Sequence, residues 1–157
     1  MERLSEHGIT SAVAMSGADI LECIVVTPEA PVHDGSAQFV GLPLDDGEMG
    51  ILPFHGPLIA RLGFGELRII EEGGGKTMRY FIDGGFVQVA GNNMVYVLTN
   101  RATPVDKIDV QAARDQLAAA MNRPAAGDAQ LEARARDETR ARMLIRVATR
   151  DTVDSGH

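Results

Sequence analysis

Residues 47–58 read GEMGILPFHGPL, and in this stretch short apolar runs are interrupted by three glycines and two prolines. The same punctuation continues on both sides, because glycine, proline or asparagine recurs every several residues from Ile20 to about Val105. The segments between these breaks are short and rich in β-branched or aromatic residues, a pattern typical of strands joined by tight turns. Residues 20–105 are therefore predicted to form a mainly β domain, a sandwich or flattened barrel.

Two of these segments carry apolar side chains on both faces. In TMRYFID, residues 77–83, Met78, Tyr80 and Ile82 alternate with Phe81, and in NMVYVLT, residues 93–99, apolar residues also occupy both sets of alternate positions. Such strands are expected to be covered on both faces. The connections 72–75 and 91–93 are predicted to be turns, because residues that tolerate positive φ cluster there.

A different periodicity begins after Pro104. Apolar residues recur every three or four positions, which predicts an amphipathic helix over 106–123. Pro124 and Gly127 break this helix, Asp128 is a candidate cap, and a second apolar stripe predicts a helix over 128–150. The two form an antiparallel hairpin, and because their stripes are mostly alanine, we expect the hairpin to gain little from packing on itself and to open easily.

The second helix is the basic element of an otherwise acidic chain. It holds six arginines against four acidic residues, whereas the whole chain has a net charge of −7. One interpretation is a solvated face with pairs four residues apart, such as Glu132 with Arg136 and Glu138 with Arg142. The other is a surface for an acidic partner. The arginines concerned are Arg134, Arg136, Arg140, Arg142, Arg146 and Arg150.

Composition excludes several functional classes. An acidic chain repels nucleic-acid phosphates, and no apolar run approaches the roughly 20 residues needed to cross a bilayer, so neither nucleic-acid binding nor direct membrane insertion is expected. The single cysteine, Cys23, lies in an apolar run and is expected to be an inert, buried thiol. Residues 1–19 are interpreted as a flexible extension and residues 151–157 as a tail.

No catalytic, metal or cofactor site is predicted. The sequence GGGKT at 73–77 resembles the end of a phosphate-binding loop, but the leading glycine of that motif is Ile70 here and a strand follows instead of a helix. The segment 45–48 lacks the alternating oxygen ligands of a calcium loop, and the histidines show no metal-ligand spacing. The chain is therefore interpreted as a non-enzyme by itself.

The order of the features is more specific than any one of them. A strand ends in VVTP at 25–28, GEMGILPFHGPL follows, then GGFVQV at 84–89, Val97-Leu98 and an acidic start to a helical hairpin. This order resembles the epsilon subunit of rotary F-type ATP synthases, the equivalent of the mitochondrial delta subunit. The resemblance covers residues 20–123 in motifs and continues to Arg150 in architecture.

The resemblance implies a non-catalytic rotor subunit of the central stalk. In that family the β domain binds the gamma subunit and rests on the ring of c subunits, so that ion flow drives ATP synthesis. The helical hairpin either folds against the β domain or extends along gamma into the alpha/beta catalytic head, where it opposes ATP hydrolysis. The implied location is the cytoplasmic face of the bacterial inner membrane, reached through the complex.

The resemblance also assigns candidate contact residues. Glu48 and His55 fall at positions that meet the c ring and gamma, and Thr27 falls where the first strand faces gamma. The alternatives are that Glu48 is a solvated turn acid and that His55 bonds to its own loop backbone. Phe54 replaces the glycine or asparagine usual before this histidine, and an exposed phenylalanine there would be an apolar anchor.

Some bacterial members bind ATP through an Asp-x-x-Arg-Ala motif in the first helix. The matching residues run from Asp109 to Ala113, and alanine replaces the motif's arginine at position 112. Arg114 lies about 200° further around a helix and is a poor substitute for it. Asp109 is left as the one ATP candidate, and no cofactor is expected. The alternative function is an independent ligand- or nucleotide-binding β sandwich.

Overall fold

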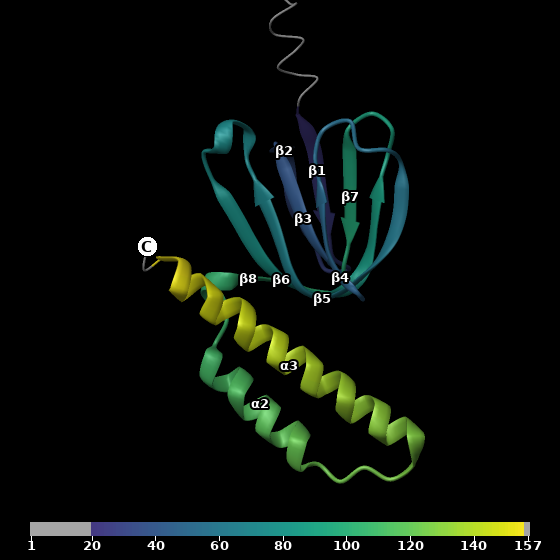
Figure 1. The fold of residues 1–157 in the computed structure, drawn as a ribbon, viewed down its shortest axis with the longest axis vertical. Helices are drawn as coiled ribbons and strands as arrows, with labels where there is room; N and C mark the ends of the chain where they lie inside the picture. The colour runs from purple at the N-terminus through teal and green to yellow at the C-terminus, as the bar shows by residue number, and fades with distance from the viewer. Residues whose placement is uncertain (1–19, 156–157) are drawn as a thin grey trace, which may run out of the picture.

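A computed structural model describes residues 20–155 of the chain. A folded β sheet is followed by two long helices (Figure 1), which confirms the predicted fold class. The predicted extension 1–19 lies outside the described residues. The strands are β1 Leu21–Val26, β2 Pro31–Ala37, β3 Phe39–Leu44, β4 Gly47–Ile51, β5 Leu58–Ile70, β6 Thr77–Val89, β7 Met94–Leu98 and β8 Ala102–Pro104.

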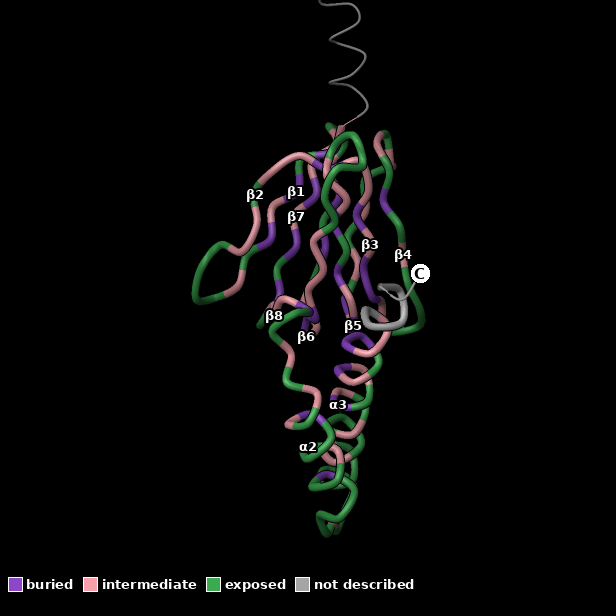
Figure 2. The backbone as a smooth tube through the Cα atoms, turned by 90° about the vertical axis from the view of Figure 1, so that its left-hand side faces the viewer, coloured by how far each residue is buried: buried purple, intermediate pink, exposed green. Residues whose placement is uncertain are grey.

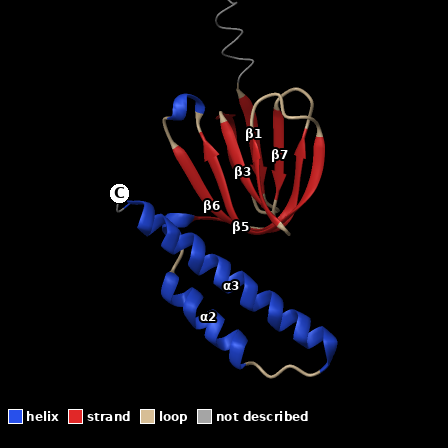
Figure 3. Ribbon diagram, viewed as in Figure 1, coloured by secondary structure: helices blue, strands red, loops and turns tan. Residues whose placement is uncertain are grey.

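The strands form one sheet in the order β2-β1-β7-β6-β5-β3-β4, and β8 pairs with β6. All the pairs are antiparallel except β1 with β7, which is parallel. The two longest strands, β5 and β6, contribute to both layers because they bend in the middle, which folds the sheet over on itself (Figure 3). GEMGILPFHGPL supplies β4, the loop after it and the first residue of β5.

Glycines sit at the bends of both long strands. On β5, a Cβ at Gly65 would lie 2.7 Å from the Cβ of Pro43 in β3. On β6, Gly84 and Gly85 have φ values of +71° and +116°, a region that L residues with side chains rarely adopt. The Thr99 hydroxyl donates a 2.7 Å hydrogen bond to the Gly84 carbonyl and fixes this bend against the end of β7. The Gly-Gly-Phe motif is therefore a corner of the fold.

The main core lies between the two layers of the folded sheet. It is built from the inward residues of β1, β3, β5, β6 and β7, and Cys23 is fully buried within it. Burial, with a smaller effect of Glu22, raises the pKa of the Cys23 thiol to about 12, so the nucleophilic thiolate is scarce at neutral pH. The predicted turns at 72–75 and 91–93 fall between β5 and β6 and between β6 and β7.

The helices differ from the prediction at their ends. A short 3-10 helix, η3, spans Val105–Lys107, and α2 begins only at Val110 because Asp109 is an extended N-cap whose carboxylate accepts a 3.0 Å hydrogen bond from the Ala112 N–H. The α2 helix ends at Asn122, and α3 spans Gly127–Ser155, past the predicted end at Arg150. Asp128 lies in the first turn of α3 and is not its cap. The Gln130 side chain instead accepts a 2.9 Å hydrogen bond from the Ala126 N–H.

The helical hairpin touches the β domain along only part of α3. Leu144 and Val147 of α3 join Phe81 of β6, Val105 and Ala113 in a second, smaller core. Figure 2 shows that the hairpin then projects away from the sheet, with exposed residues along most of its surface. The buried residues of α2 are the alanines Ala113 and Ala120, as expected for a hairpin with a narrow apolar seam.

Candidate interaction surfaces

The first candidate surface is the outside of the β1–β7–β6 layer. Residues on these strands alternate between the core and the outside, and the outward positions are largely apolar. We call these residues, with Ile59 at the start of the neighbouring strand β5, the outer apolar face, which consists of Ile24, Val26, Ile59, Phe86, Tyr96 and Leu98.

The strand register makes the outer apolar face continuous. Leu98 of β7 pairs with Val26 on one side and with Phe86 of β6 on the other. Val26 is 38% exposed, Phe86 53%, Leu98 54% and Ile59, on β5, 71%. Adjacent apolar side chains left this open to water are typical of a protein–protein contact.

The prediction that segments 77–83 and 93–99 are covered on both faces is correct for the first and wrong for the second. The outward Phe81 of β6 is buried by α3 and η3. Leu98 of β7 has no such cover among residues 20–155. The sequence did indicate an exposed apolar surface here. A strand with apolar residues on both faces needs a partner on each face, and without a helix to cover one of them that partner must be another protein.

Thr27 lies directly after Val26, at the border of the outer apolar face. Its hydroxyl donates a 2.9 Å hydrogen bond to the Ala30 carbonyl and accepts one from the Ala30 N–H, so the side chain closes the β1–β2 turn. The Thr27 N–H also bonds to the Ala30 carbonyl, at 3.1 Å. Thr27 therefore shapes the edge of this surface by holding the turn.

Phe54 and His55 lie in the loop between β4 and β5. Phe54 is 68% exposed, and its backbone adopts φ +70°, which is strained for an aromatic residue. The Asn93 side chain holds this conformation by accepting a 2.7 Å hydrogen bond from the Phe54 N–H. His55 is half-buried, with Nδ1 2.8 Å from the Gly56 carbonyl, which matches the predicted alternative of bonding to its own loop. The loop thus presents Phe54 to solvent from a backbone that Asn93 holds in place.

The structure does not bring Glu48 and His55 together. His55 lies in the loop beside the β6–β7 turn, because Phe54 bonds to Asn93 of that turn. Glu48, next to the β3–β4 turn, pairs with Pro43 and is exposed at the opposite end of the sheet. There it lines a cleft of about 820 Å³ between the β domain and α3. The GEMGILPFHGPL motif therefore spans the length of the β domain and contributes to both of its ends.

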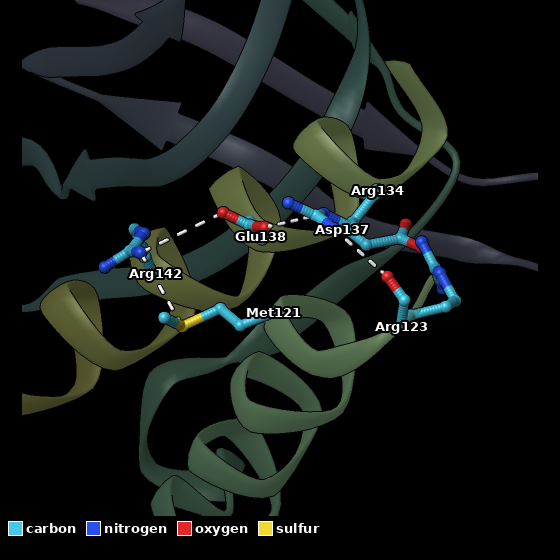
Figure 4. Close-up of polar contacts among 6 residues, drawn as sticks. All are labelled: Met121, Arg123, Arg134, Asp137, Glu138 and Arg142. Carbon is cyan, nitrogen blue, oxygen red and sulfur yellow. Dashed lines mark hydrogen bonds and ion pairs between the residues drawn. The ribbon is translucent and has the colours of Figure 1, made fainter. Parts of the chain in front are cut away.

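The arginines of α3 are not equivalent. Arg134 and Arg142 lie on either side of Glu138, at 3.3 and 4.0 Å, and Figure 4 shows this group beside Met121 of α2. A second contact joins the helices, since Asp137 pairs with Arg123 at 2.9 Å. The pair of Glu138 with Arg142 fits the predicted solvated face, whereas the predicted pair of Glu132 with Arg136 is not formed among the described residues.

Arg140 and Arg150 instead face the β domain, where they pair with Asp83 and Glu66. No local pattern predicts these pairs, which join residues 57 and 84 positions apart. Arg136 and Arg146 line the cleft, and no ion pair is found for either within the described part of the chain.

No metal or membrane-spanning element is found within the residues that the structure describes. Across 20–155, no group of three histidine, cysteine or acidic side chains is arranged to hold a metal ion. None of the helices in that range is both long and apolar enough to cross a bilayer. Asp109, the one ATP candidate, uses its carboxylate to cap α2.

Comparison with known proteins gives consistent matches. Residues 20–105 match the family model described as the ATP synthase delta/epsilon chain, beta-sandwich domain. A protein of Rhodopirellula baltica named ATP synthase epsilon chain is 42% identical over 128 residues, which cover 82% of this chain and 98% of that protein. A protein of the same name from Carboxydothermus hydrogenoformans is 45% identical over 106 residues, covering 68% of this chain and 77% of that one.

Two solved assemblies contain chains of the same fold. One is the Euglena gracilis mitochondrial ATP synthase, in a structure of its OSCP, F1 and c-ring parts, with a TM-score of 0.66, 21% identity and coverage of 87% of this chain and 82% of that one. The other is the central stalk and c ring of the Tetrahymena thermophila mitochondrial ATP synthase, with a TM-score of 0.65, 15% identity and coverage of 82% and 96%.

Proposed function

This chain belongs to the family of ATP synthase delta and epsilon chains, and from that membership we propose that it is a non-catalytic rotor subunit linking gamma to the c ring. The observation that carries the proposal is the outer apolar face. It lies in the matched β domain and leaves Phe86, Leu98 and Ile59 at least half exposed. A surface of this kind needs a permanent partner, and gamma is the partner that the family provides.

We assign the gamma contact to the outer apolar face together with the 52–57 loop. The two are continuous, because the loop leads directly into β5 and Ile59 is the second residue of that strand. Phe54 is the natural anchor of the loop, since it is aromatic and exposed and Asn93 holds its backbone in place. In this arrangement His55 positions the loop, and Thr27 shapes the opposite border.

We assign the c-ring contact to the end of the β domain that carries Glu48. This exposed carboxylate has no ion pair among the described residues and lies far along β4 from the 52–57 loop. The separation supports a linking role, because one small domain then has distinct surfaces for two partners. The chain reaches the membrane, at the cytoplasmic face of the bacterial inner membrane, through these contacts.

We further propose that the hairpin opposes ATP hydrolysis by reaching the alpha/beta head. The α3 helix has 29 residues, and at 1.5 Å per residue it is about 43 Å long, enough to enter a central cavity. Its exposed arginines Arg136, Arg142 and Arg146, together with the half-buried Arg134, suit an acidic surface there. Arg140 joins them once it leaves Asp83.

Co-expression with gamma tests the central part of this function. The full chain should co-purify with gamma as a stoichiometric complex, and its failure to do so would contradict the proposal. Deleting residues 106–157 tests the inhibitory part separately. The truncated chain should still assemble with gamma, and hydrolysis by the complex should rise; unchanged hydrolysis would remove the inhibitory role and leave the linking role in place.

A further inference from the structure

Two acidic side chains of the β domain are largely removed from water where α3 crosses it. Glu66 of β5 has a side chain only 5% exposed, and that of Asp83, at the bend of β6, is 17% exposed. Carboxylates this poorly hydrated are destabilised unless cations and hydrogen bonds compensate for the lost water. Both find an arginine on α3.

Asp83 holds Arg140 with both of its carboxylate oxygens. Nε of Arg140 donates to Oδ1 at 2.8 Å, and Nη2 donates to Oδ2 at 3.0 Å, a two-pronged arrangement that fixes the orientation of the arginine. The same guanidinium lies 5.5 Å from the ring centroid of Phe81, within the range of a cation–π contact. Arg140 is thus bound by an anion and by an aromatic ring of the same strand.

Glu66 links the second point of α3 to the β domain. One carboxylate oxygen pairs with Arg79 of the neighbouring strand β6, and the other accepts a hydrogen bond from Nη1 of Arg150 at 3.2 Å. Arg150 lies ten residues beyond Arg140, or almost three turns of helix. The two arginines therefore attach α3 at separate points along its length.

The apolar contact between these points is confined to residues 141–148 of α3, where Met143 and Ile145 pack on the second core and Ala141 and Ala148 are also buried. Leu144 and Val147 are the α3 residues buried in the second core, and the segment of α3 before Arg140 extends past the β domain with most of its residues exposed (Figure 2). Hydrophobic burial therefore holds α3 along this one stretch, and the two ion pairs add to it at or beyond the two ends of the stretch.

We propose that Asp83–Arg140 and Glu66–Arg150 form a two-point latch that sets whether α3 stays on the β domain or is released. Removing Asp83 or Arg140 leaves the other, poorly hydrated charge without its ion-pair partner in the docked state, whereas in the released state water hydrates the same charge. Glu66 keeps Arg79 when Arg150 leaves, so this second point costs less to open. Release also frees Arg140 and Arg150 for an acidic partner. The latch itself is a property of the single chain, and only its regulatory consequence rests on the proposed inhibitory role.

The latch can be measured in the full chain by the distance between two spin labels. Asp45 and Arg136 line the same cleft from opposite sides, so labels on cysteines at these positions report whether α3 is docked. Native Cys23 is fully buried and does not compete for the label. Asp83→Asn and Arg140→Gln should each raise the ratio of long to short distances about tenfold, a shift of about 1.4 kcal/mol. Arg142→Gln is the matched control, because Arg142 contacts only the hairpin.

A double variant separates a latch from two unrelated effects. Asp83→Asn combined with Arg140→Gln should release α3 no more than either change alone, because both remove the same contact. Distance distributions equal to that of Arg142→Gln would overturn the proposal. Faster hydrogen exchange in β7 of the Arg140→Gln chain would also overturn the proposal. It would show that Arg140 stabilises the β domain itself and does not only hold α3 on it.

The assembled complex tests the consequence separately. Asp83→Asn releases the latch without altering any residue of α3, so it should lower ATP hydrolysis by the complex several-fold. A released α3 with unchanged hydrolysis would support the latch and contradict the inhibitory role. An α3 that stays docked in the Asp83→Asn chain would overturn the latch, whatever the hydrolysis rate.

Discussion

A Cβ atom on Gly85 would lie 1.9 Å from the carbonyl oxygen of Leu98, closer than any non-bonded pair of these atoms can approach. The two residues belong to β6 and β7, and the contact occurs at the corner where β6 turns from one layer of the sheet to the other. Gly85 also has φ +116°, so both space and backbone conformation require glycine. The neighbouring Phe86 and Leu98 belong to the outer apolar face, whose shape depends on this corner.

Gly85→Ala should therefore destabilise the β domain severely. The methyl group forces β6 and β7 apart, and we expect a loss of at least about 3 kcal/mol in the free energy of unfolding, measured by urea denaturation. Gly75→Ala is the control, because Gly75 has φ −72° and nothing lies within 4 Å of its added Cβ. The control should change stability by less than about 1 kcal/mol. Equal effects would contradict the role given to the corner.

The Cys23 thiol should be inert in the folded chain. Because burial raises its pKa to about 12, its thiolate is rare at pH 8, and a thiol reagent should react only after the chain unfolds. The rate of reaction with an aromatic disulfide reagent, with and without denaturant, measures this directly. Fast reaction in native buffer would show that β1 opens to solvent.

Cysteines placed at Glu48 and His55 should cross-link to different partners. These residues lie at opposite ends of the β domain, so in the assembled complex Glu48→Cys should cross-link to a c subunit and His55→Cys to gamma. The unsubstituted chain is the control, since Cys23 is buried. Cross-linking of both positions to a single partner would contradict the assignment of two separate surfaces.

Asp109→Ala should weaken the start of α2 without affecting nucleotide binding. Loss of the N-cap hydrogen bond to the Ala112 N–H should cost about 1 kcal/mol, seen as faster hydrogen exchange in the first turn. Calorimetry of the unsubstituted chain with millimolar ATP should give no binding heat, because alanine occupies the position of the motif arginine. ATP binding that disappears in Asp109→Ala would instead support the nucleotide-binding alternative.

The sequence predicted the parts of this fold that depend on local patterns. The strand and turn region, the hairpin of helices and the break around Pro124 all follow from periodicity and from residues that stop helices or strands. Helix ends were less predictable, because Asp109 and Gln130 decide them through single side-chain hydrogen bonds. A sequence pattern does not distinguish a residue that caps a helix from one that lies in its first turn.

The surfaces could be predicted only in part. The family resemblance names Thr27, Glu48 and His55 as contact residues, which stays a prediction, and nothing local shows that Glu48 lies at the far end of the domain from His55. The latch could not be predicted, because Asp83 and Arg140 are 57 residues apart and meet only after β6 bends. The outer apolar face is foreshadowed by β7, which has apolar residues on both of its faces. The same pattern also predicts that both faces are covered, so it does not by itself show that one face is open.

The affinity of the chain for gamma, measured for Leu98→Ser and Leu131→Ser, shows whether the outer apolar face is the gamma-binding surface. The two leucines are similarly exposed, at 54% and 48%, but Leu98 lies at the centre of the outer apolar face and Leu131 lies on α3, away from it. If that face binds gamma, Leu98→Ser should weaken the complex roughly thirtyfold, or about 2 kcal/mol, and Leu131→Ser less than threefold. Equal affinities for the two variants would contradict the claim that the β domain binds gamma through this face.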